Sequence, residues 1–392
     1  MTLLKLLPNE LVDQILSDLP NPDLASACCV CRRLYHIALP LLYREPHLTT
    51  TDQQPTSLEL FLRTLLTPAC EYFGSNVRCL TIEWTRRRIR LDEGEPPFLA
   101  AARSRFALGD ARPPELMQVI LLLRLVPRLE ALHLPIARMP LSLMSSINPV
   151  YQLETIPPTL RDFTYQWNAA TNWINAGNLL SLLGLPRIRS IVIPGWFESG
   201  YTAVDAGADA AGTSSLTHLM ILSGSMGVQP LRNILSIPRA LAHFVYRPAG
   251  IAFNFSFASF ALALHPLKHS LISLELDFRV ANAQVPSHLP PTTIGSLRDW
   301  PALRSLTCTL RMLLEKDSRG LAWLLPAGIR ELRILDDVEP PLQEAVNVVV
   351  ELMAVKEVVP ALEMVRVYEY HMKSKRLRKR LKKACWAAGV GL

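Results

Sequence analysis

The first forty-odd residues carry apolar side chains at helical spacing. Leu11, Ile15 and Leu19 follow one another at every fourth position with Leu16 beside them, which predicts a short helix with one apolar stripe. Pro20 ends this helix, and two further helical patterns follow up to residue 38. Because three short helices bury little surface, we expect the remaining apolar face to bind a partner.

A second pattern, P-x-L-x-x-L-x-L, begins at Pro127 and recurs through the rest of the chain. Its first core position falls at Leu129, Leu160, Ile188, Leu216, Leu241, Leu271, Leu303, Ile329 and Leu362. These nine positions are 25 to 33 residues apart, and five of them follow a proline at the same offset. Such regular spacing predicts stacked structural repeats. An earlier copy at Val77 lies 52 residues before Leu129, which predicts one missing or distorted repeat between them.

Each copy is expected to contribute one strand, because proline is tolerated at a strand's first residue and alternation places the last two apolar residues on one face. Leucine-dense linkers such as Glu115 to Val126 and Leu342 to Val358 predict helices between the strands. The predicted fold class is therefore α/β: an N-terminal three-helix segment, then a solenoid with a curved parallel sheet and outer helices. An irregular α/β domain with leucine-rich strands is the alternative.

The N-terminal pattern Leu7-Pro8-x-Glu10-Leu11-x-x-x-Ile15-Leu16-x-x-Leu19, followed by Val30-Cys31-Arg32-Arg33-Leu34, resembles an F-box. The resemblance implies a domain that binds a Skp-family adaptor and, through it, a cullin ubiquitin ligase. The residues that it places in the adaptor contact are Leu7, Pro8, Leu11, Ile15, Leu16, Leu19, Leu24, Val30, Cys31 and Leu34. Tyr35 stands where the family often has tryptophan, which keeps an aromatic ring. The alternative is an ordinary helical cap on the domain behind it.

The repeats resemble leucine-rich repeats, and an F-box followed by such repeats is a pairing common among fungal substrate adaptors. The asparagine that usually follows the L-x-L element is absent, since Pro135-Ile136-Ala137 stands there in the first copy. The repeat pattern therefore leaves open whether the curved sheet has regular horseshoe curvature. The predicted domains are an F-box at residues 1–48, a repeat region at 49–372 with irregular early repeats at 49–126, and a basic tail at 373–392.

Composition indicates a folded protein, with 49% hydrophobic and 19% charged residues. No apolar run is long enough to span a membrane, and the N-terminus does not resemble a signal peptide. We therefore expect a cytoplasmic or nuclear protein whose seven cysteines are free thiols.

The net charge is +7, but Lys373 to Lys383 holds eight basic residues, so the rest of the chain carries −1. This distribution argues against a broad nucleic-acid-binding surface and leaves three interpretations of the tail: a closing helix, a nuclear-import signal or a local nucleic-acid contact.

The sequence has no nucleophile elbow, phosphate-binding glycine loop or zinc-protease motif, so we predict no catalysis, no cofactor and no metal. Cys28-x-x-Cys31 has metal-ligand spacing but no second pair, and small buried side chains are the favoured interpretation. The predicted function is that of a substrate-recognition subunit of a Skp–cullin–F-box ubiquitin ligase. A non-degradative interaction scaffold is the main alternative, and a nuclear nucleic-acid-associated protein is a third.

Target binding is predicted on the strand residues that flank the core positions, because these side chains point away from the core. The set is polar and carries both signs of charge. Its members are His133, Gln166, His243, Arg247, Glu275, Asp277, Arg333, Arg366 and Tyr368. A solvated sheet face without a ligand is the alternative.

Overall fold

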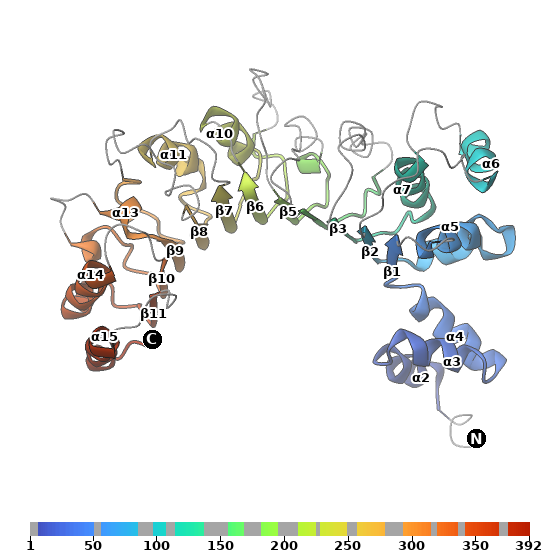
Figure 1. Cartoon of the computed structure of the whole chain (residues 1–392), viewed down its shortest axis with the longest axis horizontal. Helices are drawn as coiled ribbons and strands as arrows, with labels where there is room; N and C mark the ends of the chain where they lie inside the picture. Colours follow the sequence, from blue (N-terminus) through green and yellow to red (C-terminus); the bar gives the residue numbers. More distant parts are fainter. Residues whose placement is uncertain are drawn as a thin grey trace. The chain divides into compact units, whose positions relative to one another are not determined.

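A computed structural model describes thirteen segments of the chain: residues 7–50, 56–84, 97–106, 114–136, 156–167, 182–194, 211–224, 228–248, 257–278, 293–314, 320–335, 342–367 and 375–392. They belong to two compact units, Met1–Ala169 and Ala170–Leu392 (Figure 1).

The first unit begins with three helices and continues with parallel strands. Its elements are α2 (Asn9–Ser17), α3 (Asn21–Cys28), α4 (Arg32–Leu42), β1 (His47–Thr50), α5 (Ser57–Leu66), the 3-10 helix η1 (Pro68–Asn76), β2 (Cys79–Trp84), α6 (Pro97–Phe106), α7 (Pro114–Leu125), β3 (Ala131–Ile136) and β4 (Asp162–Trp167). Neighbouring strands follow chain order from β1 to β4 and pair in parallel.

The N-terminal helices α2, α3 and α4 close around a small apolar core, which confirms the predicted three-helix segment. Val12, Leu16, Leu24 and Ala38 form this core. The Arg33 side chain ties α4 to the start of α2, because its Nε donates a 2.8 Å hydrogen bond to Asn9 Oδ1 and its guanidinium also donates to the Leu7 carbonyl. These polar contacts fix the crossing of helices whose apolar core is small.

An aromatic stack joins the three-helix segment to α5 and η1. The ring of Tyr43, at the end of α4, stacks on Phe73 of η1 with 4.6 Å between ring centroids and on Phe61 of α5 with 5.8 Å. Burial raises the pKa of the Tyr43 phenol, with smaller contributions from nearby ionisable groups that include Cys70.

The Thr56 and Glu59 side chains form a capping box at the start of α5, which sets where that helix begins.

The early repeat at Val77 is confirmed, and the long interval that follows it adds no strand to the sheet. Val77, Leu80 and Ile82 are all fully buried. Strand β2 pairs directly with β3, with Cys79 opposite Ala131, so no strand lies between them. Part of the long interval instead forms helices α6 and α7, the second of which confirms the helix predicted from Glu115 to Val126.

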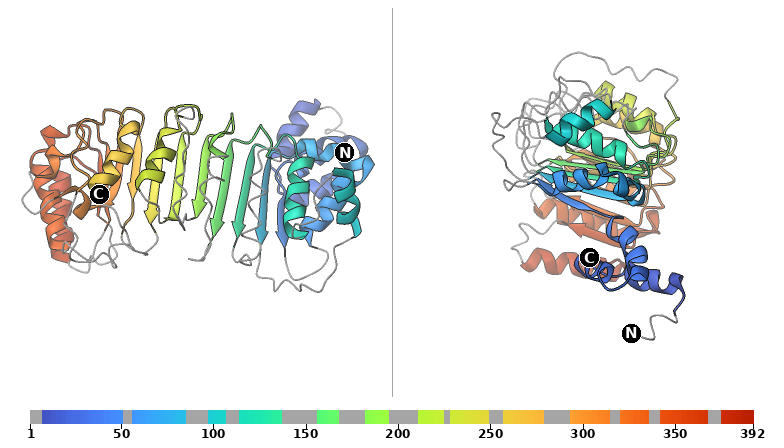
Figure 2. Two further views of the ribbon diagram at one scale, coloured as in Figure 1. Left: turned by 90° about the horizontal axis from the view of Figure 1, so that it is seen from above. Right: turned by 90° about the vertical axis from the view of Figure 1, so that its right-hand side faces the viewer.

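The second unit contains seven described strands and the helices between them. Its elements are β5 (Ser190–Pro194), β6 (His218–Gly224), α10 (Val228–Ser236), β7 (His243–Pro248), α11 (Phe257–Leu264), η4 (His265–Leu267), β8 (Ser273–Leu276), β9 (Ser305–Thr309), α13 (Leu310–Leu313), η5 (Leu321–Trp323), β10 (Glu331–Leu335), α14 (Leu342–Ala354), η6 (Lys356–Val358), β11 (Met364–Val367) and α15 (Lys375–Ala387). The strands run in parallel and in chain order (Figure 2), and Figure 1 shows α10 and α11 on one face of them.

Burial confirms the repeat pattern in both units. All nine first core positions, from Leu129 to Leu362, are at most 1% exposed. The next two apolar positions of each copy are buried as well, as Phe244 and Tyr246 of β7 illustrate. Burying each large side chain contributes about 1.5–3 kcal/mol, so the stacked copies supply the core that one copy lacks. Within each unit, parallel strands with helices between them constitute a leucine-rich-repeat-like α/β fold.

Backbone hydrogen bonds at the strand entries form a ladder along the repeats. The carbonyl before one strand accepts the N–H groups of two consecutive residues in the next repeat, as when Arg78 accepts from Glu130 at 2.7 Å and Ala131 at 2.9 Å. In the second unit the same arrangement ends at Arg330, which accepts from Glu363 and Met364. A carbonyl that accepts two consecutive N–H groups in this way holds neighbouring repeats in register.

Helix α15 and the last residues close the second unit at β11 (Figure 1). Leu381 and Cys385 of α15 are buried where this helix packs on α14. Arg380 donates a 2.7 Å hydrogen bond to Asn347 Oδ1, and Lys356 Nζ donates one of 2.8 Å to the Ala388 carbonyl. The closing-helix interpretation of the basic tail is therefore the one that the structure supports.

Candidate functional site

The first candidate surface is the outer side of α2. Leu11 and Ile15 are 45% and 52% exposed, whereas their neighbours Val12 and Leu16 are 1% and 6% exposed. Residues four apart lie on the same side of a helix, so Leu11 and Ile15 form one apolar strip that faces solvent. Large aliphatic side chains that are exposed to solvent side by side on a folded domain are typical of a protein-binding surface.

The ten residues predicted to contact an adaptor divide into two groups. Leu16 and Leu24 belong to the core of the three-helix segment, and Leu7, Leu19 and Leu34 pack against that core. The solvent-exposed members are Pro8, Leu11, Ile15, Val30 and Cys31, with Val30 50% exposed. The first group holds the helices together, and the second is free to contact a partner.

The two cysteines near this surface, Cys28 and Cys31, are less buried than the sequence predicted. Cys31 is exposed, so the expectation of a small buried side chain is wrong at that position. Cys28 is half-buried, and burial, with a smaller contribution from Cys29, raises the pKa of its thiol. Within the described segments, no group of three or more histidine, cysteine or acidic side chains has the geometry to hold a metal ion.

The second candidate surface consists of solvent-facing side chains on the strands of the second unit. His218 of β6 and His243 of β7 lie opposite each other in the register, and their rings stack with centroids 4.2 Å apart and planes 9° apart. Thr217 Oγ1 lies 2.8 Å from His218 Nδ1. Burial lowers the pKa of His243, and the neighbouring His218 lowers it further.

Two clusters of ion-paired side chains lie on the same strands, one on β7 and β8 and the other on β10 and β11. Arg247 donates from Nε and Nη2 to Glu275 Oε1 at 2.8 and 2.6 Å, which joins β7 to β8. Glu331 of β10 accepts from Arg333 Nε at 2.8 Å, and Arg366 Nε lies 3.9 Å from the same oxygen. These ion pairs are solvent-accessible, so they orient the side chains while adding little stability.

The predicted target-binding residues are divided between the two units. His133 of β3 and Gln166 of β4 belong to the first unit, and His133 is half-buried. Asp277 follows β8, where its backbone N–H donates to the Tyr246 carbonyl at 3.0 Å. Tyr368 lies outside the described residues. His243, Arg247, Glu275, Arg333 and Arg366 all lie on strands of the second unit.

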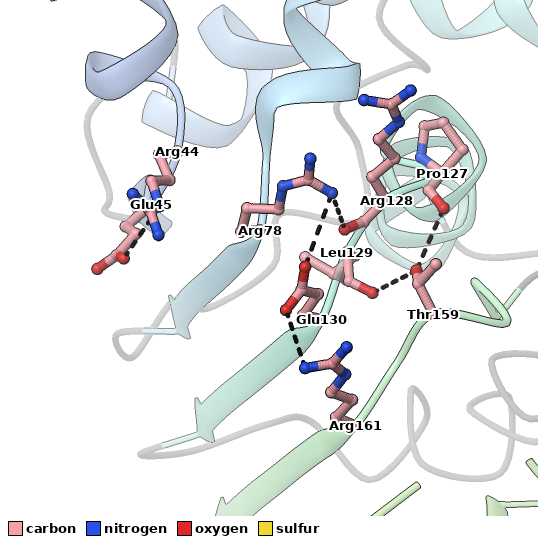
Figure 3. A network of polar contacts seen from close by, with 9 residues as sticks. All are labelled: Arg44, Glu45, Arg78, Pro127, Arg128, Leu129, Glu130, Thr159 and Arg161. Carbon is pink, nitrogen blue, oxygen red and sulfur yellow. Dashed lines mark hydrogen bonds and ion pairs between the residues drawn. The ribbon is translucent and has the colours of Figure 1, made fainter. Parts of the chain in front are cut away.

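A polar network in the first unit was not predicted from the sequence (Figure 3). The Glu130 carboxylate lies between Arg78 and Arg161. Its Oε1 is 3.7 Å from Arg78 Nη1, and its Oε2 is 3.7 Å from Arg161 Nη1.

Thr159 Oγ1 donates to the carbonyl of Leu129, the core residue of the preceding repeat, at 2.7 Å. Ser215 and Ser270 make the corresponding bonds to Ile188 at 2.8 Å and Leu241 at 2.9 Å. A hydroxyl residue directly before the core leucine is the sequence signal for these bonds.

Comparison with known protein families identifies the N-terminal segment. The family model described as F-box-like matches residues 4–49, which include α2, α3 and α4. The chain carries an F-box-like domain. F-box domains bind Skp-family adaptors in Skp–cullin–F-box ubiquitin ligases, so the exposed strip on α2 lies on a domain of the adaptor-binding kind.

Among solved structures, the chain is similar to the leucine-rich repeat-containing protein LegL7 from Legionella pneumophila, with 14% identity and a TM-score of 0.41 over 87% of this chain and 88% of that one. No curated protein matches the sequence. In the described part of the chain, no helix has the length and apolarity needed to cross a membrane.

Proposed function

We propose that this F-box protein is a substrate-recognition subunit of a Skp–cullin–F-box ubiquitin ligase and contributes no catalytic group of its own. The observation that carries the proposal is the solvent-exposed pair Leu11 and Ile15 on an F-box-like domain whose core is already complete without them. Burying these two side chains against an adaptor removes apolar surface from water. This stabilises the complex by about 25 cal/mol per Å² of buried apolar area.

The repeats would hold the target, and the adaptor would link it to the ubiquitin-transfer machinery. Tethering raises the effective concentration of target lysines near the transferring enzyme, so the rate increases without chemistry from this chain. The aromatic stack of Tyr43 on Phe73 supports this role, because it joins the F-box-like domain to η1, the helix that leads into β2.

The adaptor contact is tested by co-purification of a Skp-family adaptor with the Leu11→Asp/Ile15→Asp variant. Binding should be lost, because each carboxylate would be buried unpaired in an apolar interface. The matched control is Gln14→Asp/Ser17→Asp, which adds two carboxylates to exposed positions of the same helix. Normal adaptor binding by the Leu11/Ile15 variant would disprove the proposal.

The target surface that we propose includes Arg247 with Glu275 on one side and Glu331 with Arg333 and Arg366 on the other. Arginine is enriched at interface hot spots, and these guanidiniums are already oriented by their carboxylate partners. Proteins captured by proximity labelling with the wild type should be lost with Arg247→Glu/Arg333→Glu, while the adaptor is retained.

The control for this surface is Arg232→Glu/Arg239→Glu, which makes the same charge change at exposed positions outside the strands. Capture of the same targets by the Arg247/Arg333 variant would exclude the strand face. Target abundance with and without the protein separates a degradative subunit from a non-degradative scaffold, because only the former shortens target lifetime.

A further inference from the structure

Helix α15 concentrates positive charge on one exposed surface. Its sequence, KRLRKRLKKACWA, contains seven basic residues and no acidic one. Lys375, Arg376, Lys379, Lys382 and Lys383 are all exposed. Basic residues four apart on a helix repel one another, so this arrangement opposes helix formation unless something else compensates.

The compensation inside the described structure comes from packing rather than from opposite charge. Leu381 is fully buried and Cys385 is 1% exposed, and both anchor α15 where it packs on α14. Among ion pairs between described residues, none involves Lys375, Lys379, Lys382 or Lys383. Their charge is therefore available to an anionic partner.

An exposed tryptophan continues the same surface. Trp386 is 86% exposed and lies three, four and seven residues after Lys383, Lys382 and Lys379, which places the four side chains on one side of the helix. Tryptophan is among the residues enriched at protein-interface hot spots, and neighbouring charges select a partner of opposite charge.

The packing of α15 decides against a membrane surface as the partner. A helix that binds lipid places its apolar side into the bilayer interface. In α15 that side is occupied, because Leu381 and Cys385 are buried in the second unit. What faces solvent is a charged surface with one large ring at its end.

We infer that the exposed face of α15, consisting of Lys379, Lys382, Lys383 and Trp386, is a docking site for an acidic segment of a partner protein that carries an aromatic side chain. The carboxylates pair with the lysines and relieve their mutual repulsion, and the aromatic side chain packs on Trp386. This site is independent of the proposed adaptor contact, which is on α2.

The test measures binding of fluorescein-labelled peptides to the purified full-length protein by fluorescence anisotropy. One probe is a glutamate-rich peptide with a single phenylalanine, and a second has serine in place of the phenylalanine. The Lys379→Gln/Lys382→Gln/Lys383→Gln variant should weaken binding of both probes by about tenfold or more. Trp386→Ala should weaken binding of the phenylalanine probe to the level of the serine probe.

The control variant Arg128→Gln/Arg187→Gln/Arg239→Gln removes three exposed positive charges elsewhere and should leave binding unchanged. Equal weakening by this control would show that binding reflects net charge alone and would overturn the docking site. An oligothymidylate of matched charge is the competing probe, and tighter binding of the oligonucleotide than of the acidic peptide would assign the surface to nucleic acid and overturn the proposal. Unaltered thermal melting of each variant shows that the helix is still packed.

Discussion

The backbone N–H of Gly391 donates a 2.7 Å hydrogen bond to the carbonyl oxygen of Glu363. Glu363 occupies the strand-entry position whose carbonyl accepts from the following repeat in the three preceding repeats, at Ile272, Arg304 and Arg330. In return, the N–H of Val365 donates to the Gly391 carbonyl at 2.9 Å. The last residues of the chain thus take the place of a next repeat and satisfy part of the edge of β11.

Replacing the Gly391 donor should destabilise this end of the second unit. Gly391→Pro removes the N–H, leaves the Glu363 carbonyl without its partner and should lower the free energy of unfolding by about 1–3 kcal/mol. Gly391→Ala keeps the donor, and its added Cβ would meet the Glu363 oxygen at an ordinary 3.4 Å. Urea denaturation of both variants decides: equal stability would show that this hydrogen bond does not contribute.

The thiols should differ strongly in reactivity. Cys29 and Cys31 are exposed, whereas full burial raises the pKa of Cys308 to about 12 and burial also raises the pKa of Cys385. Since the thiolate is the reactive form, iodoacetamide at neutral pH should label Cys29 and Cys31 first and Cys308 only after unfolding. Mass spectrometry of the labelled peptides over time gives the order, and early labelling of Cys308 would contradict its burial.

Acidification should weaken the second unit at the stacked histidines. Because the folded-state pKa of His243 is lowered from 6.5, the unfolded chain takes up its proton first as the pH falls. The stability that neutral His243 contributes is present above about pH 6.5 and is lost as the pH falls through the lowered folded-state value. His243→Gln should flatten this part of the pH dependence of thermal melting, whereas His269→Gln, at an exposed position, should not.

A buried hydroxyl offers a stabilising substitution. Thr309 is fully buried at the end of β9, and its Oγ1 has no hydrogen-bond partner among the described residues. Thr309→Val replaces that hydroxyl with a methyl group of similar size and should raise the free energy of unfolding by roughly 1 kcal/mol. Thr309→Ser keeps the hydroxyl and loses the methyl, so it should be destabilising. A loss of stability in the valine variant would point to an unseen partner for the hydroxyl.

The F-box shows where sequence periodicity reaches its limit. The spacing placed Leu11, Ile15 and Leu16 in one apolar stripe, yet Leu16 is buried with Val12 while Leu11 and Ile15 face solvent. A helix whose apolar arc is wide has two edges, and periodicity cannot tell which edge meets the rest of the protein. The positions of α3 and α4 decide this, so core and binding residues separate only in the folded domain.

The sequence by itself determined the repeat, that is, the core positions from Leu129 to Leu362 and the strand alternation, because these depend on local spacing along one chain segment. Only the tertiary structure decided that β2 pairs directly with β3 and that Gly391 completes the ladder at Glu363. It also decided which hydroxyls support the neighbouring repeat, as Thr159 does for Leu129. Each of these contacts joins residues from different repeats, and the distance between such residues is set by stacking rather than by the order of residues along the chain.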